Sequence, residues 1–426
     1  MLGKIIIIIF AVAMKTTITP HPVELSIKAP ASKSFAQRAV AAALLSAGRS
    51  ELSGVEPSAD TLAALQSASR LGAKVSKSHN HTYIIEGPLA PRHSSIDIGE
   101  SGLSTRLFTP IAALWPHPIT ITGHGSILAR PMEFMRGPLE QLGVSFQSSG
   151  GSLPLTVCGP MRGGGRVEAE GSLSSQFISG LLFALPLAQE DTTLVVSRLT
   201  SRPYIDITLE VLHSFGVEVE NRDYQEFFIS AAQSYHPTDY TVEGDWSGAS
   251  CPLVAGALGG RVRISGLNSH SVQADRRIME ALEMAQAGVE YLGGDIVVSH
   301  RPLLCFDFDA TQCPDLFPAL VALASACHGS SRLVGTERLI HKESNRALTL
   351  RQEFGKMGIE VDIDSEPNTM IVTGGTPRPA LLSSHGDHRI AMAVAVAALR
   401  GSGVVEIEQA EAVEKSYPRF WDDISR

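Results

Sequence analysis

Cationic and hydroxyl side chains of this sequence gather at the starts of strongly apolar segments. The set comprises Lys33, Ser34, Arg38, Gly102, Arg106, Ser174, Ser175, Gln176, Asp315, His388 and Arg389. The first turn of a helix presents unpaired N–H groups and about half a positive charge, and it therefore favours anions. A cation at that end opposes the helix dipole unless an anion lies between them, so the set as a whole indicates binding of anionic ligands. Each serine taken alone is also explained as a helix cap.

Polar residues also occur in the loops that precede amphipathic segments. They are Arg130 in GHGSILARP, Ser201 and Tyr204 in TSRPYID, Lys342, Glu343 and Arg346 in KESNR, and Lys415 in EAVEKSYP. Loops at one edge of a repeated unit are where ligand groups gather. The KESNR segment is equally compatible with an ordinary solvated helix start.

The sequence predicts neither a metal site nor a disulfide. His385, Asp387 and His388 superficially resemble metal ligands, but no cysteine or other clear partner accompanies them. The five cysteines are scattered and form no C-x-x-C pair. We therefore expect them to be buried hydrophobic residues in a protein of the reducing cytoplasm.

The elements that position these residues recur along the chain. Apolar helical segments begin near Ser34, Gly102, Ser174, Ser247, Asp315 and Asp387, at offsets of 68, 72, 73, 68 and 72 residues. A glycine followed by apolar residues ends a second, amphipathic helix at Gly72, Gly143, Gly216, Gly288 and Gly358, which are 71, 73, 72 and 70 residues apart. Glycine after a helix supplies the left-handed conformation that ends it. Two markers with one period indicate six similar units.

Each unit is predicted to contain a strand, an apolar helix, a strand, an amphipathic helix and one or two further strands. A helix without a polar face must be buried on all sides, so we expect an α/β fold with interior helices. Six units could form one solenoid or two compact bodies. The polar, turn-rich segment 235–244 favours two bodies of three units each.

Length and composition indicate a packed globular protein. The chain has 426 residues, of which 44% are hydrophobic and 19% charged, and its net charge is −9. The acidic total gives no general footprint for nucleic acid or an anionic membrane. The apolar run 5–13 falls short of the about 20 residues that cross a bilayer. We expect residues 1–13 to be a leader or an upstream mis-start outside the fold, with a secretion signal or an extra strand as alternatives.

Six segments in order resemble the enolpyruvyl transferase family, and within it the branch that acts on shikimate 3-phosphate. They are APASKSFAQR, EGSLSSQF, SRPYIDIT, KESNR, GDHRIAM and EAVEKSYP. The resemblance implies a two-domain inside-out α/β barrel, in which six βαβαββ repeat units, three per domain, surround buried parallel helices. Residues 32–243 would form the first domain. Residues 14–31 and 244–426 would form the second, with a two-stranded hinge near residues 30 and 244.

The resemblance also implies a reaction. The enolpyruvyl group of phosphoenolpyruvate would pass to the 5-hydroxyl of shikimate 3-phosphate with release of phosphate, on the route to chorismate and aromatic amino acids. Both substrates carry a carboxylate and a phosphate, which guanidinium groups bind bidentately. The reaction needs no metal or organic cofactor. We expect a monomeric, cytoplasmic enzyme whose partners are these two small molecules, without nucleic acid or membrane.

Site residues are carried over from the resemblance position by position. The shikimate 3-phosphate contacts would be Lys33, Ser34, Arg38, Ser174, Ser175, Gln176, Ser201, Tyr204, Asp315 and Lys342. The phosphoenolpyruvate contacts would be Lys33, Gly102, Arg130, Gln176, Arg346, Arg389 and Lys415. Asp315 would accept the proton of the 5-hydroxyl, and Glu343, with Lys33, would protonate the methylene carbon.

Several departures from the family pattern bear on the site. Glu100 stands where an amide is usual, Leu103 where a threonine is usual, and Asn345 where an aspartate is usual. The residues just before Lys342 do not supply the asparagine often found there. One shikimate contact is therefore unassigned.

Two other functions are weighed against this one. The related enzymes that act on UDP-N-acetylglucosamine carry a reactive cysteine in the corresponding loop. In this chain the loop reads GHGSILARP and contains no cysteine, which argues against that function. A non-catalytic repeat scaffold would bind partners across its surface. The cations and carboxylates at matching edges of the units argue against a scaffold.

Overall fold

The computed structural model describes residues 14–87, 91–340 and 342–425. The leader or mis-start expected at residues 1–13 lies outside the described residues. Within the described ranges, no helix has both the length and the apolar character needed to cross a membrane.

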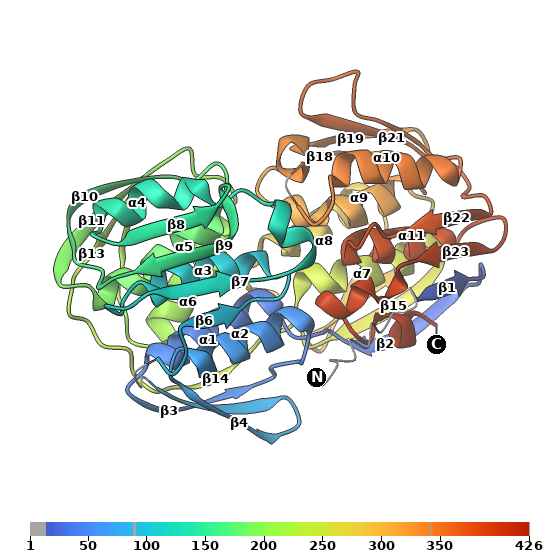
Figure 1. Cartoon of the computed structure of the whole chain (residues 1–426). Coiled ribbons are helices and arrows are strands. Elements are labelled where there is room, and N and C mark those ends of the chain that lie inside the picture. The colour runs from blue at the N-terminus through green and yellow to red at the C-terminus, as the bar shows by residue number, and fades with distance from the viewer. Residues whose placement is uncertain (1–13, 88–90, 341, 426) are drawn as a thin grey trace, which may run out of the picture.

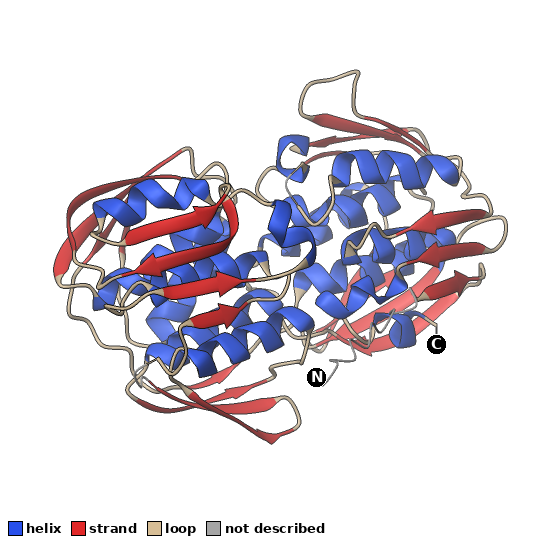
Figure 2. Cartoon of the chain, in the orientation of Figure 1, coloured by secondary structure: helices blue, strands red, loops and turns tan. Residues whose placement is uncertain are grey.

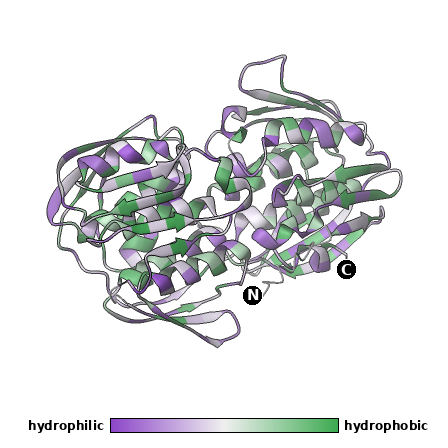
Figure 3. Ribbon diagram, in the orientation of Figure 1, coloured by the Kyte–Doolittle hydropathy of each residue, from purple (hydrophilic) through white to green (hydrophobic). Residues whose placement is uncertain are grey.

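Six helices lie in the interior, one at each predicted apolar segment. They are α1 (Lys33–Leu45), α3 (Gly102–Ala112), α5 (Ser175–Ala184), α7 (Trp246–Gly259), α9 (Phe317–Ala324) and α11 (His388–Ala398). Every residue of α3, α9 and α11 is buried. Figure 3 shows hydrophobic residues concentrated on these inner helices and hydrophilic ones on outer helices and loops. The expectation of interior helices, drawn from the lack of a polar face, is confirmed.

A second set of helices lies outside the first and buries only part of its surface. The set comprises α2 (Ala59–Arg70), α4 (Arg136–Gln141), α6 (Pro203–Ser214), α8 (Ile278–Met284), α10 (Arg346–Lys356) and the short α12 (Phe420–Ile424). The 3-10 segments are η1 (Gly125–Ala129), η2 (Glu133–Met135), η3 (Leu185–Leu187), η4 (Ala274–Arg277), η5 (Pro314–Leu316), η6 (Thr336–Leu339) and η7 (Ala410–Lys415).

Small sheets enclose the inner helices (Figure 2). Three are four-stranded and come mainly from the first half of the chain, in the strand orders β14-β3-β5-β4, β6-β7-β9-β8 and β10-β11-β13-β12. Their strands are β3 (Gly48–Ser53), β4 (Lys74–His79), β5 (Thr82–Gly87), β6 (Ser95–Asp97), β7 (Ile119–Thr122), β8 (Ser145–Ser149), β9 (Ser152–Cys158), β10 (Gly163–Glu170), β11 (Glu190–Ser197), β12 (Glu220–Arg222), β13 (Glu226–Ile229) and β14 (Asp239–Thr241). In each sheet the first pair is parallel and the other two pairs are antiparallel.

The second half of the chain forms two four-stranded sheets, in the orders β16-β17-β15-β2 and β18-β19-β21-β20, and one three-stranded sheet, β1-β23-β22. Its strands are β1 (Lys15–Ile18), β2 (Val23–Lys28), β15 (Gly260–Ser265), β16 (Gly288–Leu292), β17 (Asp295–Ser299), β18 (Asp307–Asp309), β19 (Ser330–Val334), β20 (Glu360–Asp362), β21 (Thr369–Thr373), β22 (Ala380–Ser383) and β23 (Val405–Glu408). The N-terminal strands belong here, because β2 pairs parallel with β15 and β1 pairs antiparallel with β23. Figure 1 shows these blue strands among the yellow and red ones.

The buried hydrophobic residues form two separate clusters. One runs from Phe35 to Val242. The other combines Ile18 to Ala29 with Trp246 to Ile424. The chain passes between them twice, and the two crossings lie side by side because Ser32 N donates to Glu243 O at 2.8 Å and Asp245 N to Pro30 O at 2.7 Å. We propose that each cluster is the core of one domain, with the bounds expected from the sequence.

Helices α3 and α5 approach closely at Gly180, where an added Cβ would lie 2.3 Å from Arg106 O and 3.0 Å from Pro110 Cγ. We expect Gly180→Ala to push the two helices apart and to lower the free energy of unfolding by about 1–3 kcal/mol. Gly355→Ala is the matched control, because no atom lies within 4 Å of its added Cβ. In that outer helix alanine should be neutral or stabilising by up to about 1 kcal/mol. Urea unfolding of both variants checks this, and a Gly180→Ala protein as stable as the control would contradict it.

Candidate active site

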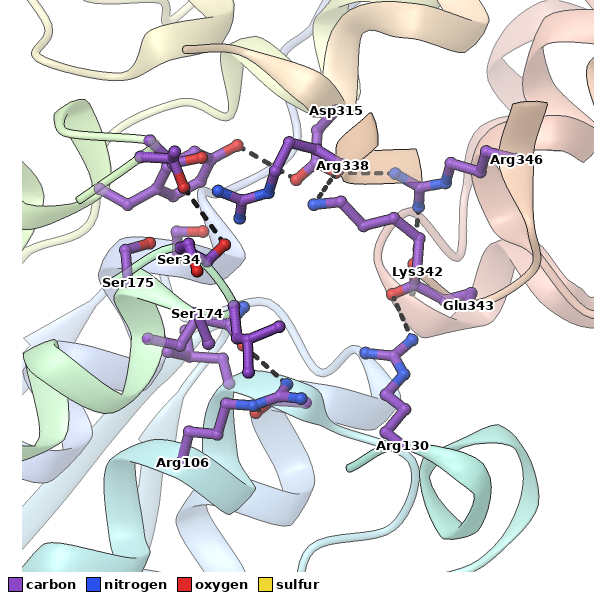
Figure 4. Close-up of a pocket in the computed structure, with 18 of the residues that line it drawn as sticks. Ser34, Arg106, Arg130, Ser174, Ser175, Asp315, Arg338, Lys342, Glu343 and Arg346 are labelled. Atoms are coloured by element: carbon purple, nitrogen blue, oxygen red, sulfur yellow. Dashed lines mark hydrogen bonds and ion pairs between the residues drawn. The ribbon is translucent and has the colours of Figure 1, made fainter. Parts of the chain in front are cut away.

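The starts of inner helices from both halves of the chain meet at one pocket with a volume of about 370 Å³. The sequence-predicted residues that line it are Lys33, Ser34, Gly102, Arg130, Ser174, Ser175, Gln176, Ser201, Tyr204, Asp315, Lys342, Glu343, Arg346 and Arg389. Figure 4 shows Ser34, Ser174, Ser175 and Arg106 on one side and Asp315, Lys342, Glu343 and Arg346 on the other. Residues more than 300 positions apart in the sequence thus face one another.

Two predicted residues, Arg38 and Lys415, are buried and do not line the pocket. Arg38 is fully buried and donates to Ser34 O (2.9 Å), Thr208 Oγ1 (2.8 Å) and Tyr204 O (3.1 Å). Burial lowers its pKa to about 10, so it stays charged at neutral pH. Arg38 therefore holds the backbone of two pocket residues in place.

Arg346 is the centre of the ionic network in the second half of the site. It is 1% exposed, and its guanidinium donates to Asp315 Oδ1 (2.7 Å), Glu343 Oε2 (2.7 Å) and Asp387 Oδ2 (2.8 Å). Asp387 also caps α11 by accepting from Arg389 N at 3.0 Å. One cation thus fixes three carboxylates that come from different elements.

The surrounding cations keep two largely buried carboxylates, Asp315 and Glu343, ionised. Burial acts to raise the pKa of Asp315, but Lys342, Arg389 and Arg346 outweigh it and hold that pKa well below its usual range. Burial likewise acts to raise the pKa of Glu343, and Arg346, Arg130 and Lys415 hold it well below. Both groups are therefore carboxylates at neutral pH.

Contacts across the pocket join the two halves of the chain. Tyr204 Oη donates to Asp315 Oδ2 at 3.1 Å, and Arg130 Nη2 lies 3.6 Å from Glu343 Oε1. Lys415 Nζ donates to Glu100 O at 3.2 Å. The acid and base candidates are thus in contact with side chains of the opposite half.

The first-half wall is built from the starts of α1, α3 and α5. Lys33 Nζ pairs with Asp60 Oδ2 at 2.9 Å, and Arg106 Nη1 donates to Gln176 Oε1 at 3.1 Å. Burial, and then the charge of Arg130, lowers the pKa of Arg106 to about 9. A Cβ at Gly102 would lie 2.7 Å from Arg130 Nη1, so a larger residue there would displace this guanidinium.

The unusual residues of the motifs have identifiable contacts. Glu100 accepts hydrogen bonds at 3.0 Å from both the backbone N and the Oγ of Ser126, and it therefore holds the loop that carries Arg130. Asn345 caps α10 by accepting from Leu348 N at 3.4 Å. Leu103 lines the pocket as an apolar surface.

Several residues that line the pocket were not predicted from the sequence. Asp60, Phe134, Leu173, Glu337 and Arg338 were not singled out, and His388 was considered only as a helix start and a metal-like residue. Both ring nitrogens of His388 are buried without a hydrogen-bond partner among the described residues. Burial and the charges of Lys33 and Arg389 hold its pKa well below the usual value, so the ring is neutral. The spacing of Arg338, four residues before Lys342, was the available signal for that residue.

Among the described residues, no cluster of three or more histidine, cysteine, aspartate or glutamate side chains could hold a metal ion. The cysteines Cys158, Cys251, Cys305, Cys313 and Cys327 are all free. Three of them are buried, while Cys305 is exposed and Cys158 is partly exposed. The expectation of a buried position is therefore wrong for Cys305. This residue directly follows Leu304, which forms an isolated β-bridge with His328.

Known proteins resemble the chain over almost its whole length. The family described as EPSP synthase (3-phosphoshikimate 1-carboxyvinyltransferase) matches residues 18–424. A 3-phosphoshikimate 1-carboxyvinyltransferase of Clostridium perfringens is 37% identical over 415 residues, which is 96% of this chain and 97% of the other. One from Methanoculleus marisnigri is 36% identical over 413 residues, 94% and 96% of the two chains. The solved EPSP synthase of Acinetobacter baumannii superposes with a TM-score of 0.81 at 25% identity, covering 97% of this chain and 98% of that one.

We expect Arg346→Gln to destabilise the protein by about 3–5 kcal/mol at pH 7, because it leaves buried carboxylates without their shared cation. Since the pKa values of Asp315 and Glu343 are lowered in the folded protein, their pairing stabilises it at neutral pH and is lost as pH falls through those values. The difference in unfolding free energy between wild type and variant should therefore stay large down to about pH 4, the ordinary pKa range of carboxyl groups, and narrow only below it. Thermal unfolding midpoints between pH 7 and about pH 3 measure it.

The control for this experiment is Arg351→Gln. Arg351 lies on α10 and pairs with the exposed Asp364 at 2.8 Å. Exposed pairs contribute little, so this variant should unfold close to wild type throughout. Equal midpoints for the two variants at pH 7 would contradict the role given to Arg346.

Proposed function

The chain belongs to the EPSP synthase (3-phosphoshikimate 1-carboxyvinyltransferase) family, and from this membership we propose that its pocket transfers the enolpyruvyl group of phosphoenolpyruvate to the 5-hydroxyl of shikimate 3-phosphate. Phosphate is released, and the product lies on the shikimate pathway toward chorismate and aromatic amino acids. One observation carries the proposal: cationic side chains from both halves of the chain surround two ionised carboxylates in a single pocket. Each substrate brings a carboxylate and a phosphate to those cations.

Phosphoenolpyruvate would occupy the region between Arg130, Arg346 and Arg389. These guanidinium groups suit its carboxylate and phosphate, since planar forks bind both groups bidentately. The further contacts proposed for it are Lys33, Gly102, Gln176 and Lys415. Arg130 already lies 3.6 Å from Glu343, so a ligand held by Arg130 lies beside that carboxylate.

Shikimate 3-phosphate would lie along the opposite wall. Ser174, Ser175 and Ser201 offer hydroxyl donors there, and the Ser201 Oγ has no hydrogen-bond partner among the described residues. The other proposed contacts are Lys33, Ser34, Arg38, Gln176, Tyr204, Asp315 and Lys342. Of these, Arg38 sits one layer deeper and would reach the ligand beside Ser34.

Asp315 is proposed as the general base. It is ionised, and Tyr204 and Lys342 fix its oxygens at 3.1 Å each. As the substrate hydroxyl attacks C2 of phosphoenolpyruvate, its O–H proton passes to Asp315 and a proton is added to C3. The resulting tetrahedral intermediate then loses the C3 proton and phosphate, which restores the double bond.

Glu343 is proposed as the group that protonates C3, together with Lys33. In the empty pocket Glu343 is a carboxylate, so it must acquire a proton before it can donate one. Substrate anions bound to Arg130, Arg346 and Lys415 would offset the charges that lower the pKa of Glu343. The substrates themselves would therefore raise that pKa and prepare the acid.

Assays of phosphate release separate this function from its alternatives. The purified full chain should release phosphate from phosphoenolpyruvate only when shikimate 3-phosphate is present. Release with UDP-N-acetylglucosamine instead would select the other branch of the enolpyruvyl transferases. No release with either acceptor would favour a non-catalytic scaffold. Action as a monomer in the cytoplasm stays a prediction from the sequence.

Glu343→Gln should lower kcat by about 100-fold or more, because the amide keeps the shape of the side chain but donates no proton to carbon. KM for both substrates should change much less. Glu360→Gln serves as the control, since Glu360 is exposed on β20 and does not line the pocket. A Glu343→Gln enzyme with normal kcat would refute the proposed acid.

Arg389→Ala and Lys415→Ala should each raise KM for phosphoenolpyruvate by about tenfold or more, since each removes a charged hydrogen-bond donor. The dissociation constant for shikimate 3-phosphate, measured alone by calorimetry, should change less than KM for phosphoenolpyruvate. Normal KM for phosphoenolpyruvate in both variants would show that these residues are wrongly assigned.

A further inference from the structure

Arg338 directs an unused cationic group into the pocket. It lies in η6, and its side chain lines the cavity. Its Nη1 atom is buried and has no hydrogen-bond partner in the part of the chain that the structure describes. Figure 4 shows the guanidinium extending from its own side of the pocket toward Ser34 on the opposite side. A buried N–H group without an acceptor is costly, so Nη1 of this partly buried cation calls for an acceptor that the described residues do not supply.

The nearby carboxylate, Asp315, is already engaged by other residues. It accepts from Tyr204 Oη at 3.1 Å and from Arg346 Nη1 at 2.7 Å, and it pairs with Lys342 at 3.1 Å. Burial lowers the pKa of Arg338, while Tyr204 and Asp315 act to raise it. The guanidinium stays charged at neutral pH, and its Nη1 remains free to bind a ligand.

The charge of Arg338 also acts on the opposite wall. It helps to lower the pKa of Arg106, after the larger effects of burial and of Arg130. Cations from the two halves therefore repel each other across the empty pocket. An anion placed between them would remove this repulsion and would be attracted from both sides.

The wall opposite Arg338 carries hydroxyls as well as cations. Ser34, Ser174, Ser175 and Ser201 are neutral donors, and Lys33 is already paired with Asp60. A phosphate monoester carries a charge of about −1.5 to −2 at pH 7. Neutral hydroxyls position such a group, but a cation is needed to balance it in a buried site.

We propose that Arg338 binds the phosphate group of shikimate 3-phosphate, opposite the serine hydroxyls of the first half. This inference rests on the proposed function and adds a residue that the family pattern did not assign. Arg338 would make the pocket select the phosphorylated ring over the same ring with a free hydroxyl. It would also hold the second half of the chain to a ligand seated on the first.

Arg338→Gln removes the charge and keeps a polar side chain of similar reach. We expect KM for shikimate 3-phosphate to rise by about tenfold or more, because a charged hydrogen bond to phosphate is lost. KM for phosphoenolpyruvate should stay within about threefold of wild type. Arg338→Lys, which keeps a point charge, should recover part of the affinity. Arg332→Gln is the control, since Arg332 pairs with Glu366 at an exposed site of the same half.

Binding of shikimate, which lacks the phosphate, separates a phosphate contact from a contact with the ring or the carboxylate. By calorimetry, Arg338→Gln should weaken binding of shikimate 3-phosphate while leaving the weaker binding of shikimate within about twofold. The ratio of wild-type to variant affinity should also grow from pH 5.5 to 7.5, as the phosphate loses its second proton with a pKa of about 6.

Three results would overturn the inference. They are unchanged affinity for shikimate 3-phosphate in a variant with wild-type thermal stability, equal weakening of shikimate and shikimate 3-phosphate, and a rise confined to KM for phosphoenolpyruvate. A destabilised Arg338→Gln protein is replaced by Arg338→Lys, for which the loss of affinity should be smaller but again confined to shikimate 3-phosphate. Wild-type turnover reports separately on the proposed function, because it does not depend on which group Arg338 contacts.

Discussion

The architecture follows from the burial of six helices that have no polar face. Such helices cannot lie on a surface, so each must be enclosed by sheets and by its neighbours, as α3, α9 and α11 are. Enclosure leaves only the ends of the helices available for polar chemistry. The first turns of α1, α3, α5 and α11, and the η5 turn that precedes α9, then become walls of one pocket, because the two halves of the chain place those ends toward each other. Burial of the helices therefore determines where the ligand-binding side chains can lie.

This arrangement produces a cationic site in a chain whose net charge is −9. Positive helix ends and the cations of their first turns, such as Lys33 and Arg389, would repel one another without compensation. The compensation comes from carboxylates on other elements: Asp60 pairs with Lys33, and Asp315, Glu343 and Asp387 share Arg346. The same pairs fix the side-chain positions before any ligand arrives, which reduces the ordering cost of binding.

Much of the fold and most of the pocket were predictable from the sequence, for a physical reason. The repeated apolar segments and helix-ending glycines indicate helices that must be buried. Buried helices leave only their ends for polar chemistry, so ligand-binding residues are expected at the helix starts. The sequence does not indicate which side chains form hydrogen bonds within the protein instead of with a ligand. Arg38 stays a predicted ligand contact, and the hydrogen bonds that it also donates to the backbone of Ser34 and Tyr204 could not be predicted. Apart from its spacing from Lys342, Arg338 showed no pattern of its own, because a free donor in a cavity is defined by its neighbours in space. Asp60 was missed for the same reason, since only its contact with Lys33 brings it to the site.

The cations of the pocket have two effects that oppose each other until substrate binds. Arg346, Arg130 and Lys415 attract anions, and the same charges hold the pKa of Glu343 so low that it keeps no proton. A site this cationic is therefore well suited to binding and poorly suited to acid catalysis while it is empty. Anionic substrates change this balance, because each charge they neutralise is removed from the field acting on Glu343 and Asp315. The acid would gain its proton and the base its basicity only when both reactants are in place, so binding and chemistry are coupled through the same side chains.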